Sequence, residues 1–498
     1  MQKLLSGKDV KRLDKAFIQF EGISSLELME RAASKFVEWF IQRFQTEAGR
    51  VIIICGTGNN GGDGLAIGRL LFLRDYVITI YTVGDVAAGS GDFSDNIHRL
   101  PLGLPLKAID DASEILLEGQ VIIDALFGVG INRPISGMFA SVVQRVNESS
   151  IPVVSVDLPS GLPADDLLQG DAVKASHTVT FQFPKRSLLL PEHAAYSGEV
   201  SVVSIGMDSF DYSAFESKLY YVQARDIPSL HKVFHRFSHK GSFGKFLLIG
   251  GSLGKMGAVA LGGRAALRTG SGLVSVCVPR CGLEPIQCSV PEVMVEVCLA
   301  EQTVSLPLPD CTNYSAIGIG PGMGTTSDAY HVLEAVLSCY GGPMVLDADA
   351  INLLALHPHL HAYLKGRVLT PHLVEFERLV GSCAHHLERM DRARAFAMAY
   401  SCVVVLKGAN TVVSLPDGVQ VVNSSGTHYM ATGGSGDVLT GIIGSFLGQG
   451  YSPEKASICG VFHHGLAGEL ASVSRRRGTI ASDILEAIPE TFLKMNIL

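Results

Sequence analysis

Two glycine-rich segments place polar side chains where a strand would give way to a helix, GTGNNGGDG at 56–64 and TGGSGD at 432–437. Bare backbone amides at a helix N-terminus attract phosphate. The asparagine and aspartate oxygens of the first segment could also hold a ribose or a hard cation. A tight turn alone does not need so many glycines and polar residues together. Both segments therefore predict sites for a phosphate-bearing ligand.

The second segment has the residue types that transfer of a phosphoryl group requires. The amides of Gly434, Ser435 and Gly436 would form an anion hole, where negative charge builds during the transfer. Asp437 follows directly and is placed to accept the proton of an attacking hydroxyl. Capping of a helix would explain Asp437 but not the glycines. The segment thus predicts phosphorylation of an alcohol.

Aspartates end two further apolar runs in the first half of the chain, Asp124 in VIIDALF and Asp157 in VVSVDL. Ligands bind beyond the carboxyl ends of parallel strands, so Asn60, Asp124 and Asp157 are expected to converge there. Each aspartate alone could instead cap a helix. Their joint occurrence, with GVGINRP and PSG following them, favours a common binding site.

The elements that must position these residues are short apolar runs rich in β-branched residues. Such runs are typical of parallel strands that are buried on both faces. A hairpin is predicted over 411–423 with its turn at Asp417-Gly418, and Ser24 with Glu27 predicts a capping box. The predicted strands are 51–55, 76–83, 121–127, 152–158, 178–183 and 200–206, then 245–251, 272–279, 316–322, 343–349, 367–372 and 402–408.

The alternation of strands and helices lapses between about 207 and 240, where the sequence is polar and aromatic without a clear period. This interruption predicts two α/β domains, 1–218 and 228–498. Each is expected to have three layers, with a parallel sheet between helices, and the first to be Rossmann-like.

Composition excludes some classes of partner and location. The 498 residues include 40 basic and 48 acidic side chains, and 40 − 48 gives a net charge of −8. This balance argues against nucleic acid and against a membrane surface as partners. No apolar run approaches the ~18 residues of a membrane span, and the first residues lack a signal-peptide pattern. Ten scattered cysteines without a CxxC pair indicate a reducing cytoplasm.

Four motifs of the first half, GNNGGDG, DALFGVGINRP, VDLPSG and TVTFQFPK, resemble the YjeF N-terminal family, the NAD(P)H-hydrate epimerases, over roughly residues 1–215. The resemblance implies that hydrated NADH or NADPH is the substrate and that Asp157 is the acid/base at its nicotinamide ring. Epimerisation by loss and return of water needs such a proton-handling group. A potassium ion would be held by Asn60, Asp124 and Ser160. The implied substrate-binding residues are Asn59, Asn60, Gly61, Gly62, Asp63, Gly128, Val129, Gly130, Ile131, Asn132, Arg133, Pro134 and Asp157.

Seven motifs of the second half resemble, in order, the YjeF C-terminal family, the ADP-dependent NAD(P)H-hydrate dehydratases, which have a ribokinase-like fold: HKGSFGK, GAVALGGRAALRTGSGLV, IGPGMG, VLDADAINLL, LTPH, VLKGANT and MATGGSGDVLTG. The resemblance implies that ADP phosphorylates the ring hydroxyl of the S form, after which phosphate leaves and the double bond returns. The implied substrate contacts are Ala258, Gly322, His372 and Asp437. The implied ADP-binding residues are Lys407, Gly408, Ala409, Asn410, Thr411, Thr427, His428, Tyr429, Met430, Ala431, Thr432, Gly433, Gly434, Ser435 and Gly436.

The same resemblance implies magnesium with ADP and association into a homo-oligomer. Glu375, three residues after His372, lies where related kinases keep a magnesium-linked acid. Asp347 and Asp349 follow a predicted strand and could assist the chemistry or cap the next helix. The expected partners are therefore hydrated NADH or NADPH and ADP.

Other interpretations remain open at this point. One alternative is a ribokinase-like small-molecule kinase with an accessory dinucleotide-binding domain, and another is a binding module without catalysis, which would not need all three aspartates. LIGGSLGKM at 248–256 lacks the spacing and the Ser/Thr of a P-loop. The histidines of HPHLH at 357–361 alternate, but a structural metal site usually has four ligands, often with cysteine, so we favour a solvated loop or helix end.

Overall fold

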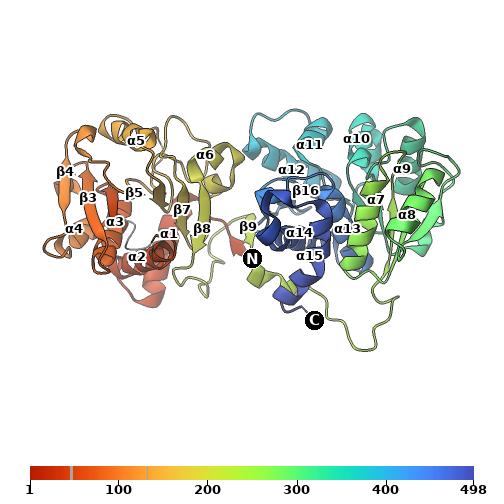
Figure 1. Cartoon of the computed structure of the whole chain (residues 1–498), viewed down its shortest axis with the longest axis horizontal. Helices are drawn as coiled ribbons and strands as arrows, with labels where there is room; N and C mark the ends of the chain where they lie inside the picture. Colours follow the sequence, from red (N-terminus) through yellow and green to blue (C-terminus); the bar gives the residue numbers. More distant parts are fainter. Residues whose placement is uncertain (45–48, 132, 498) are drawn as a thin grey trace. The chain divides into compact units, whose positions relative to one another are not determined.

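The computed structural model describes residues 1–44, 49–131 and 133–497. The chain divides into two compact units, one of Lys3–Ser217 and one of Met1–Gln2 with Lys218–Leu498 (Figure 1). It begins with the short strand β1 (Gln2–Lys3). Within the described ranges, no helix has both the length and the apolar composition that crossing a membrane requires.

The unit of Lys3–Ser217 is built on a parallel sheet. Both faces of the sheet are covered, which explains why its central strands are apolar at successive positions. The strands, in the order in which they pair, are β4 (Leu106–Ile109), β3 (Val77–Val83), β2 (Arg50–Cys55), β5 (Val121–Ala125), β6 (Val153–Val156), β7 (His177–Phe181) and β8 (Glu199–Val203).

Two hydrophobic cores lie on opposite faces of this sheet, because successive side chains of a strand point to opposite sides. Val51, Ile53 and Cys55 pack with the second, third and fourth helices, whereas Ile52 and Ile54 pack with the fifth. The unit therefore has three layers. Its helices are α1 (Gly7–Glu21), α2 (Ser25–Ile41), α3 (Asn59–Phe72), α4 (Gly91–His98), α5 (Met138–Glu148) and α6 (Ala194–Ser197).

The second unit contains a longer sheet that is parallel except where β17 pairs with β16 and β18. From β9 onwards, its strands in pairing order are β9 (Leu219–Val222), β18 (Gln420–Asn423), β17 (Val412–Ser414), β16 (Val403–Leu406), β15 (Val368–Leu369), β14 (Met344–Leu346), β13 (Ala316–Ile319), β10 (Lys245–Ile249), β11 (Leu273–Val278) and β12 (Met294–Val297).

Helices again cover both faces of the second sheet (Figure 1). Phe246 and Leu248 of β10 pack with α7 (Met256–Arg268), α8 (Leu283–Ser289), α13 (Ser435–Gly448), α14 (Pro453–Arg475) and α15 (Ala481–Lys494). Leu247 and Ile249 pack with α9 (Ser327–Cys339), α10 (Asp349–Leu356), α11 (Leu373–Val380) and α12 (His386–Tyr400). This unit also has three layers.

The predicted fold class, two α/β/α arrangements, is confirmed, as are all the predicted strands within a few residues at their ends. The capping box of Ser24 with Glu27 is present. The predicted hairpin consists of β17 and β18 with Gly418 at φ +82° in the turn. The strands that sequence analysis missed are short, and β4 and β12 are edge strands with exposed positions.

Candidate active sites

The glycine-rich turn of the first unit leads from β2 into α3, which begins at Asn59. The N-cap residue, Gly58, offers no side chain to the amides of the first turn. Gly61 is required by close packing, because an added Cβ would lie 1.7 Å from the carbonyl oxygen of Gly56. The N-terminus of α3 is therefore open to an anionic group that approaches the bare backbone.

A cavity of about 850 Å³ opens beside this turn. Its lining includes residues of α1, α2 and the α3 turn and of the segments that follow β5, β6, β7 and β8. The volume is typical of pockets that hold small molecules and cofactors. The predicted residues that line it are Asn59, Asn60, Asp63, Gly128, Val129, Gly130, Ile131, Arg133 and Asp157.

The remaining predicted substrate residues lie elsewhere. Gly61 and Gly62 are buried in the first turn of α3 and form its packing surface. Pro134 lines a neighbouring cavity of about 400 Å³. Asn132 falls outside the residues that the structure describes.

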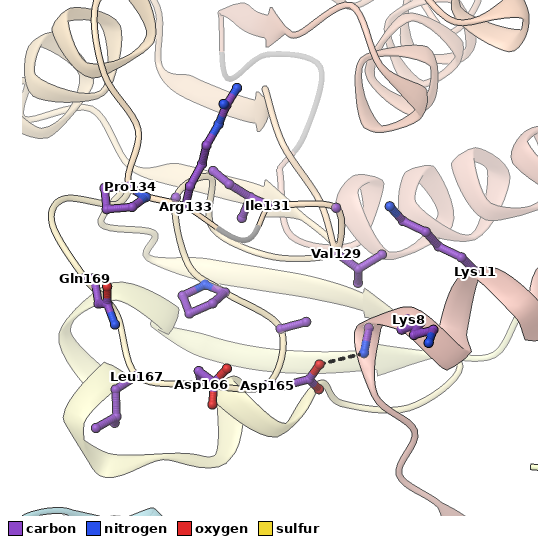
Figure 2. Close-up of a pocket in the computed structure, with 15 residues that line it drawn as sticks. Lys8, Lys11, Val129, Ile131, Arg133, Pro134, Asp165, Asp166, Leu167 and Gln169 are labelled. Carbon is purple, nitrogen blue, oxygen red and sulfur yellow. Dashed lines mark hydrogen bonds between the residues drawn. The ribbon is translucent and has the colours of Figure 1, made fainter. Parts of the chain in front are cut away.

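Figure 2 shows this neighbouring cavity, which Lys8 and Lys11 of α1 line, with the Lys11 side chain extending toward Val129 and Ile131. Lys11, Ile131 and Arg133 also line the larger cavity, so the two cavities adjoin. The carboxylate of Asp165 accepts a hydrogen bond of 2.9 Å from the first amide of α1. This bond ties the start of α1 to the cavity wall.

Asp157 follows β6 with φ +67°, a left-handed conformation that an aspartate adopts at modest cost. Its Oδ1 accepts hydrogen bonds from Thr180 Oγ1 at 3.0 Å and the Phe181 amide at 3.2 Å, and also from Lys185 Nζ. Lys185 is 2% exposed, so the pair is buried. No residue in the described part of the chain bonds Asp157 Oδ2, so this oxygen is available to a ligand.

Asp124 is buried at the end of β5. Its Oδ1 accepts a hydrogen bond from Ser160 Oγ at 2.6 Å, and its Oδ2 accepts one from Ser155 Oγ at 2.8 Å. Burial raises the pKa of Asp124, and the serine donors oppose that rise. Among the described residues no cationic side chain pairs with this carboxyl. A buried carboxylate with oxygen neighbours and no counter-charge fits a cation site.

Asn60, the third predicted potassium ligand, lies against the loop that begins at Gly128. A Cβ added to Gly128 would lie 3.0 Å from Asn60 Oδ1. Asn60 Nδ2 is buried and has no hydrogen-bond partner within the described ranges. The structure therefore brings Asp124 and Ser160 together, and it leaves Asn60 with an unsatisfied polar atom beside the cavity.

In the second unit, the predicted anion hole lies at the N-terminus of α13. Gly434 is the N-cap residue with φ +89° and provides no side-chain cap. The positive φ favours glycine, and a Cβ added there would lie 2.6 Å from Leu261 Cδ1, so Leu261 would have to move. The first-turn amides of Ser435 and Gly436 are thus free of a side-chain cap, which is the arrangement that binds phosphate.

Asp437 lies in this first turn beside a charged cluster. Lys407 Nζ is 2.9 Å from Asp347 Oδ1 and 4.0 Å from Glu375 Oε2. Thr440 Oγ1 donates a hydrogen bond of 2.6 Å to the other oxygen of Asp347. Burial raises the pKa of Asp437 to about 7, the negative charges of Asp347 and Glu375 add to the rise, and the Lys407 ammonium opposes it. A carboxyl tuned near neutrality is suited to proton transfer at neutral pH.

The predicted substrate contacts of this unit lie on α7, in the turn after β13, at the N-cap of α11 and on α13. His372 caps α11, accepts hydrogen bonds from Val374 N and Glu375 N at Nδ1, and approaches Glu375 Oε1 with Nε2 at 3.2 Å. Ala258 of α7 lies next to Gly322, since a Cβ added to Gly322 would be 3.6 Å from Ala258 Cβ. His372 and Asp437 are connected through the cluster that contains Glu375.

The two predicted ADP-binding segments meet at Lys407. A Cβ added to Gly436 would lie 3.4 Å from Lys407 Nζ, so 407–411 adjoins the end of 427–436. Thr411 Oγ1 closes the first segment by bonding the carbonyl of Gly408 at 3.0 Å. In the second, Ser435 Oγ lies 3.1 Å from His464 Nε2, and burial lowers the pKa of His464 to about 4.

The alternating histidines do not form a metal centre. His361 is buried and bonds the carbonyl of Leu354 at 3.0 Å, whereas His357 packs on Tyr330 with ring centres 4.3 Å apart. His361 therefore departs from the predicted solvated position. In the described part of the chain, no group of three or more His, Cys, Asp and Glu side chains is arranged to hold a metal ion. A magnesium ion bound with nucleotide needs fewer protein ligands, because phosphates and waters complete its shell.

Sequence analysis missed several residues of both sites. Asp14 of α1 and Lys185 line the larger cavity, and neither was assigned a role. Lys185 ends the TVTFQFPK motif, so its position beside a strand end was a usable signal. Thr440 and His464 lie within apolar helical patterns that gave no indication of a site.

Comparison with known proteins gives matches to both units. The family described as YjeF-related protein N-terminus matches residues 25–187, and the NAD(P)H-hydrate dehydratase family matches residues 246–490. A ribokinase-like superfamily protein from Enterococcus faecalis has a similar structure, with 26% identity and a TM-score of 0.50. That match covers 57% of this chain and 99% of the other.

Two relatives match over nearly the whole length. Each is named a bifunctional NAD(P)H-hydrate repair enzyme. The protein from Moorella thermoacetica is 34% identical over 98% of this chain and 96% of its own length. The protein from Escherichia coli is 34% identical over 96% of this chain and 92% of its own length. The chain belongs to the family of bifunctional NAD(P)H-hydrate repair enzymes.

Proposed function

We propose that this chain repairs hydrated NADH and NADPH, with the unit of Lys3–Ser217 interconverting the R and S forms. The second unit dehydrates the S form at the expense of ADP. The observation that carries this proposal is the half-buried Asp437 beside the uncapped N-terminus of α13 and the Lys407 ammonium. Family membership favours this function over a small-molecule kinase with an accessory domain.

Dehydration would proceed in two balanced steps. Asp437 accepts the proton of the ring hydroxyl, whose oxygen attacks the terminal phosphorus of ADP, and the bond to AMP breaks. The phosphate then leaves the ring with the electron pair of its C–O bond, a ring proton is lost, and the double bond returns. Because phosphate is a much better leaving group than hydroxide, this route accounts for a nucleotide requirement.

The residues around Asp437 would stabilise the transferred group. Amides at the start of α13 face the developing negative charge, and Lys407 supplies a positive charge fixed by Asp347. Asp347 and Glu375 are the carboxylates that would hold magnesium, and their hard oxygens fit that ion. When bound, magnesium would neutralise phosphate charge.

In the first unit, Asp157 would handle the proton at the nicotinamide ring, with its free Oδ2 toward the cavity. Asn60, Asp124 and Ser160 would hold potassium, whose charge would compensate the buried Asp124 carboxylate. The loop 128–134 and the first turn of α3 would bind the dinucleotide. We further propose that the chain forms a homo-oligomer, acts in the cytoplasm and has no nucleic-acid or membrane partner.

Separating the two activities tests this assignment. Asp437→Asn should abolish ADP-dependent recovery of reduced-coenzyme absorbance while leaving interconversion of the two epimers intact. Asp157→Asn should do the reverse when the S epimer is supplied. A protein that ignores the hydrate but consumes ATP with a vitamin or a sugar would instead be a kinase, and the proposal would fail.

A further inference from the structure

Helix α1 contributes an acid to the larger cavity that neither the motifs nor the matched family regions include. The match to the first unit begins at residue 25, whereas Asp14 lies on α1 and lines the cavity with Asp157 and Lys185. In the described ranges the Asp14 carboxyl makes no hydrogen bond and no ion pair. A half-buried acid without a partner requires an explanation.

The position of Asp14 is fixed because α1 is anchored at its start and along one face. Ser6 caps the helix by accepting a hydrogen bond from Asp9 N at 3.2 Å, and the first amide of α1 bonds Asp165 at 2.9 Å (Figure 2). Leu13 and Phe17 are each 1% exposed. The helix therefore holds Asp14 toward the cavity as a rigid element.

Several other charged groups line the cavity with Asp14. The carboxyls of Asp63 and Asp157 and the ammonium of Lys185 line the same cavity as Asp14 and interact with its charge, and Lys11 and Lys15 on its own helix also line the cavity. Lys185 is already bonded to Asp157 Oδ1. Of the mutually interacting carboxyls of Asp14, Asp63 and Asp157, only that of Asp157 is paired with Lys185, so uncharged forms of the other two are favoured.

We propose that Asp14 is a second catalytic acid/base of the epimerase site and works opposite the Asp157–Lys185 pair. This inference rests on the proposed function of the first unit. Asp14 delivers a proton to the departing hydroxyl, and Asp157 Oδ2 accepts one from the returning water. Lys185 positions Asp157 for that step by holding its other oxygen.

In this reaction the hydroxyl leaves from a carbon that is bonded to the ring nitrogen. The Asp14 proton goes to the hydroxyl oxygen, the C–O electron pair leaves with water, and the nitrogen lone pair forms a C=N bond. Water then adds to the opposite face, the C=N pair returns to nitrogen, and the proton goes to Asp157. Solvent in the open cavity then returns a proton to Asp14 and takes one from Asp157, which restores both groups.

The ionisation of Asp14 supports this role. Burial raises its pKa to about 6, the charge of Asp157 adds to the rise, and Lys185 opposes it. Burial also raises the pKa of Asp63, with the charges of Asp157 and Asp14 adding to the effect. A carboxyl whose pKa lies near the working pH can give up a proton and regain it, as a general acid must.

The test uses the full chain, the R epimer of hydrated NADH and no ADP, with the two epimers separated by chromatography. Asp14→Asn should lower kcat by about 100-fold or more with little change in KM, the effect expected when a proton donor is lost. Asp14→Glu should recover activity, because it restores an acid. Asp95→Asn, an exposed aspartate on α4, is the matched control and should behave as wild type.

The dependence of the rate on pH distinguishes a catalytic role of Asp14 from a merely structural one. In wild type, kcat/KM should fall as pH rises above about 6, where Asp14 loses its proton, and Asp14→Asn should lack this limb. Wild-type inactivity would contradict the proposed function itself. Interconversion by wild type with an unaltered rate and profile in Asp14→Asn would overturn only the role of Asp14. If Asp14→Asn and Asp14→Glu lose activity equally while thermal melting shows that both are folded, the catalytic role of Asp14 would also be overturned.

Discussion

Replacing Asp437 by asparagine should abolish dehydration and at the same time stabilise the second unit. The side chain keeps its size, but the group that accepts the hydroxyl proton is lost. Loss of a positioned general base lowers the rate by about 100- to 10,000-fold. The gain in stability follows from the environment of Asp437, where burial and the carboxylates of Asp347 and Glu375 disfavour its charge.

The size and sign of that gain follow from the pKa of Asp437, which rises from 3.8 to about 7. The folded state therefore holds a proton that the unfolded chain releases between these values, and stability is lost as pH rises through them. At 1.36 kcal/mol per unit, the full cost above pH 7 is on the order of 4 kcal/mol, an upper bound. Asparagine does not titrate, so its advantage should be small near pH 4 and largest near pH 8.

Denaturant unfolding of the full chain at about pH 5 and pH 8 measures this effect. If the two units unfold separately, the transition that moves when ADP is added belongs to the second unit, because ADP stabilises the folded unit that binds it. The advantage of Asp437→Asn should be about 2 kcal/mol larger at the higher pH. Asp391→Asn, an exposed aspartate on α12, is the control and should show no such difference. An Asp437→Asn variant that is equally stable at both pH values, or still turns over normally, would refute the reasoning.

Three further outcomes are expected. Lys407→Met should weaken ADP binding in calorimetry and move the midpoint of the pH–rate profile upward, because Lys407 lowers the pKa of Asp437. Gly434→Ala should lower the melting temperature and ADP affinity, since φ is +89° and the new Cβ would lie 2.6 Å from Leu261 Cδ1. Replacing potassium by lithium should slow epimer interconversion but not dehydration of the pure S epimer. Unchanged behaviour in any of these assays would contradict the corresponding assignment.

Much of the fold was predictable because its strands are buried on both faces. Runs such as 51–55 and 403–406 have no polar alternation, and this pattern has few alternatives to a parallel sheet between helices. The rule that ligands bind at strand carboxyl ends predicted that Asn60, Asp124 and Asp157 would converge. Asn60 and Asp157 line one cavity, whereas Asp124 is buried and is not among the residues that line it. β9 was missed because it lies in the polar, aromatic stretch and is formed by pairing with β18.

The partners that tune these sites were not predictable from local sequence. The bond between Thr440 and Asp347 joins residues 93 apart, and Thr440 lies in an apolar helix whose pattern indicates only burial. Asp14 lies one position after buried Leu13 on an amphipathic helix, where an acid is usually solvated. Its position in a cavity depends on the packing of α1 against elements more than a hundred residues away.

The fate of the oxygen atom in the ring hydroxyl tests most directly the claim that this hydroxyl is phosphorylated before it leaves the ring. The S epimer, labelled with heavy oxygen in its ring hydroxyl, would be incubated with ADP and the Asp157→Asn variant, which prevents exchange of the label by epimerisation. If the hydroxyl is phosphorylated before elimination, the inorganic phosphate released should contain the label. Labelled water together with unlabelled phosphate would contradict the phosphorylation mechanism.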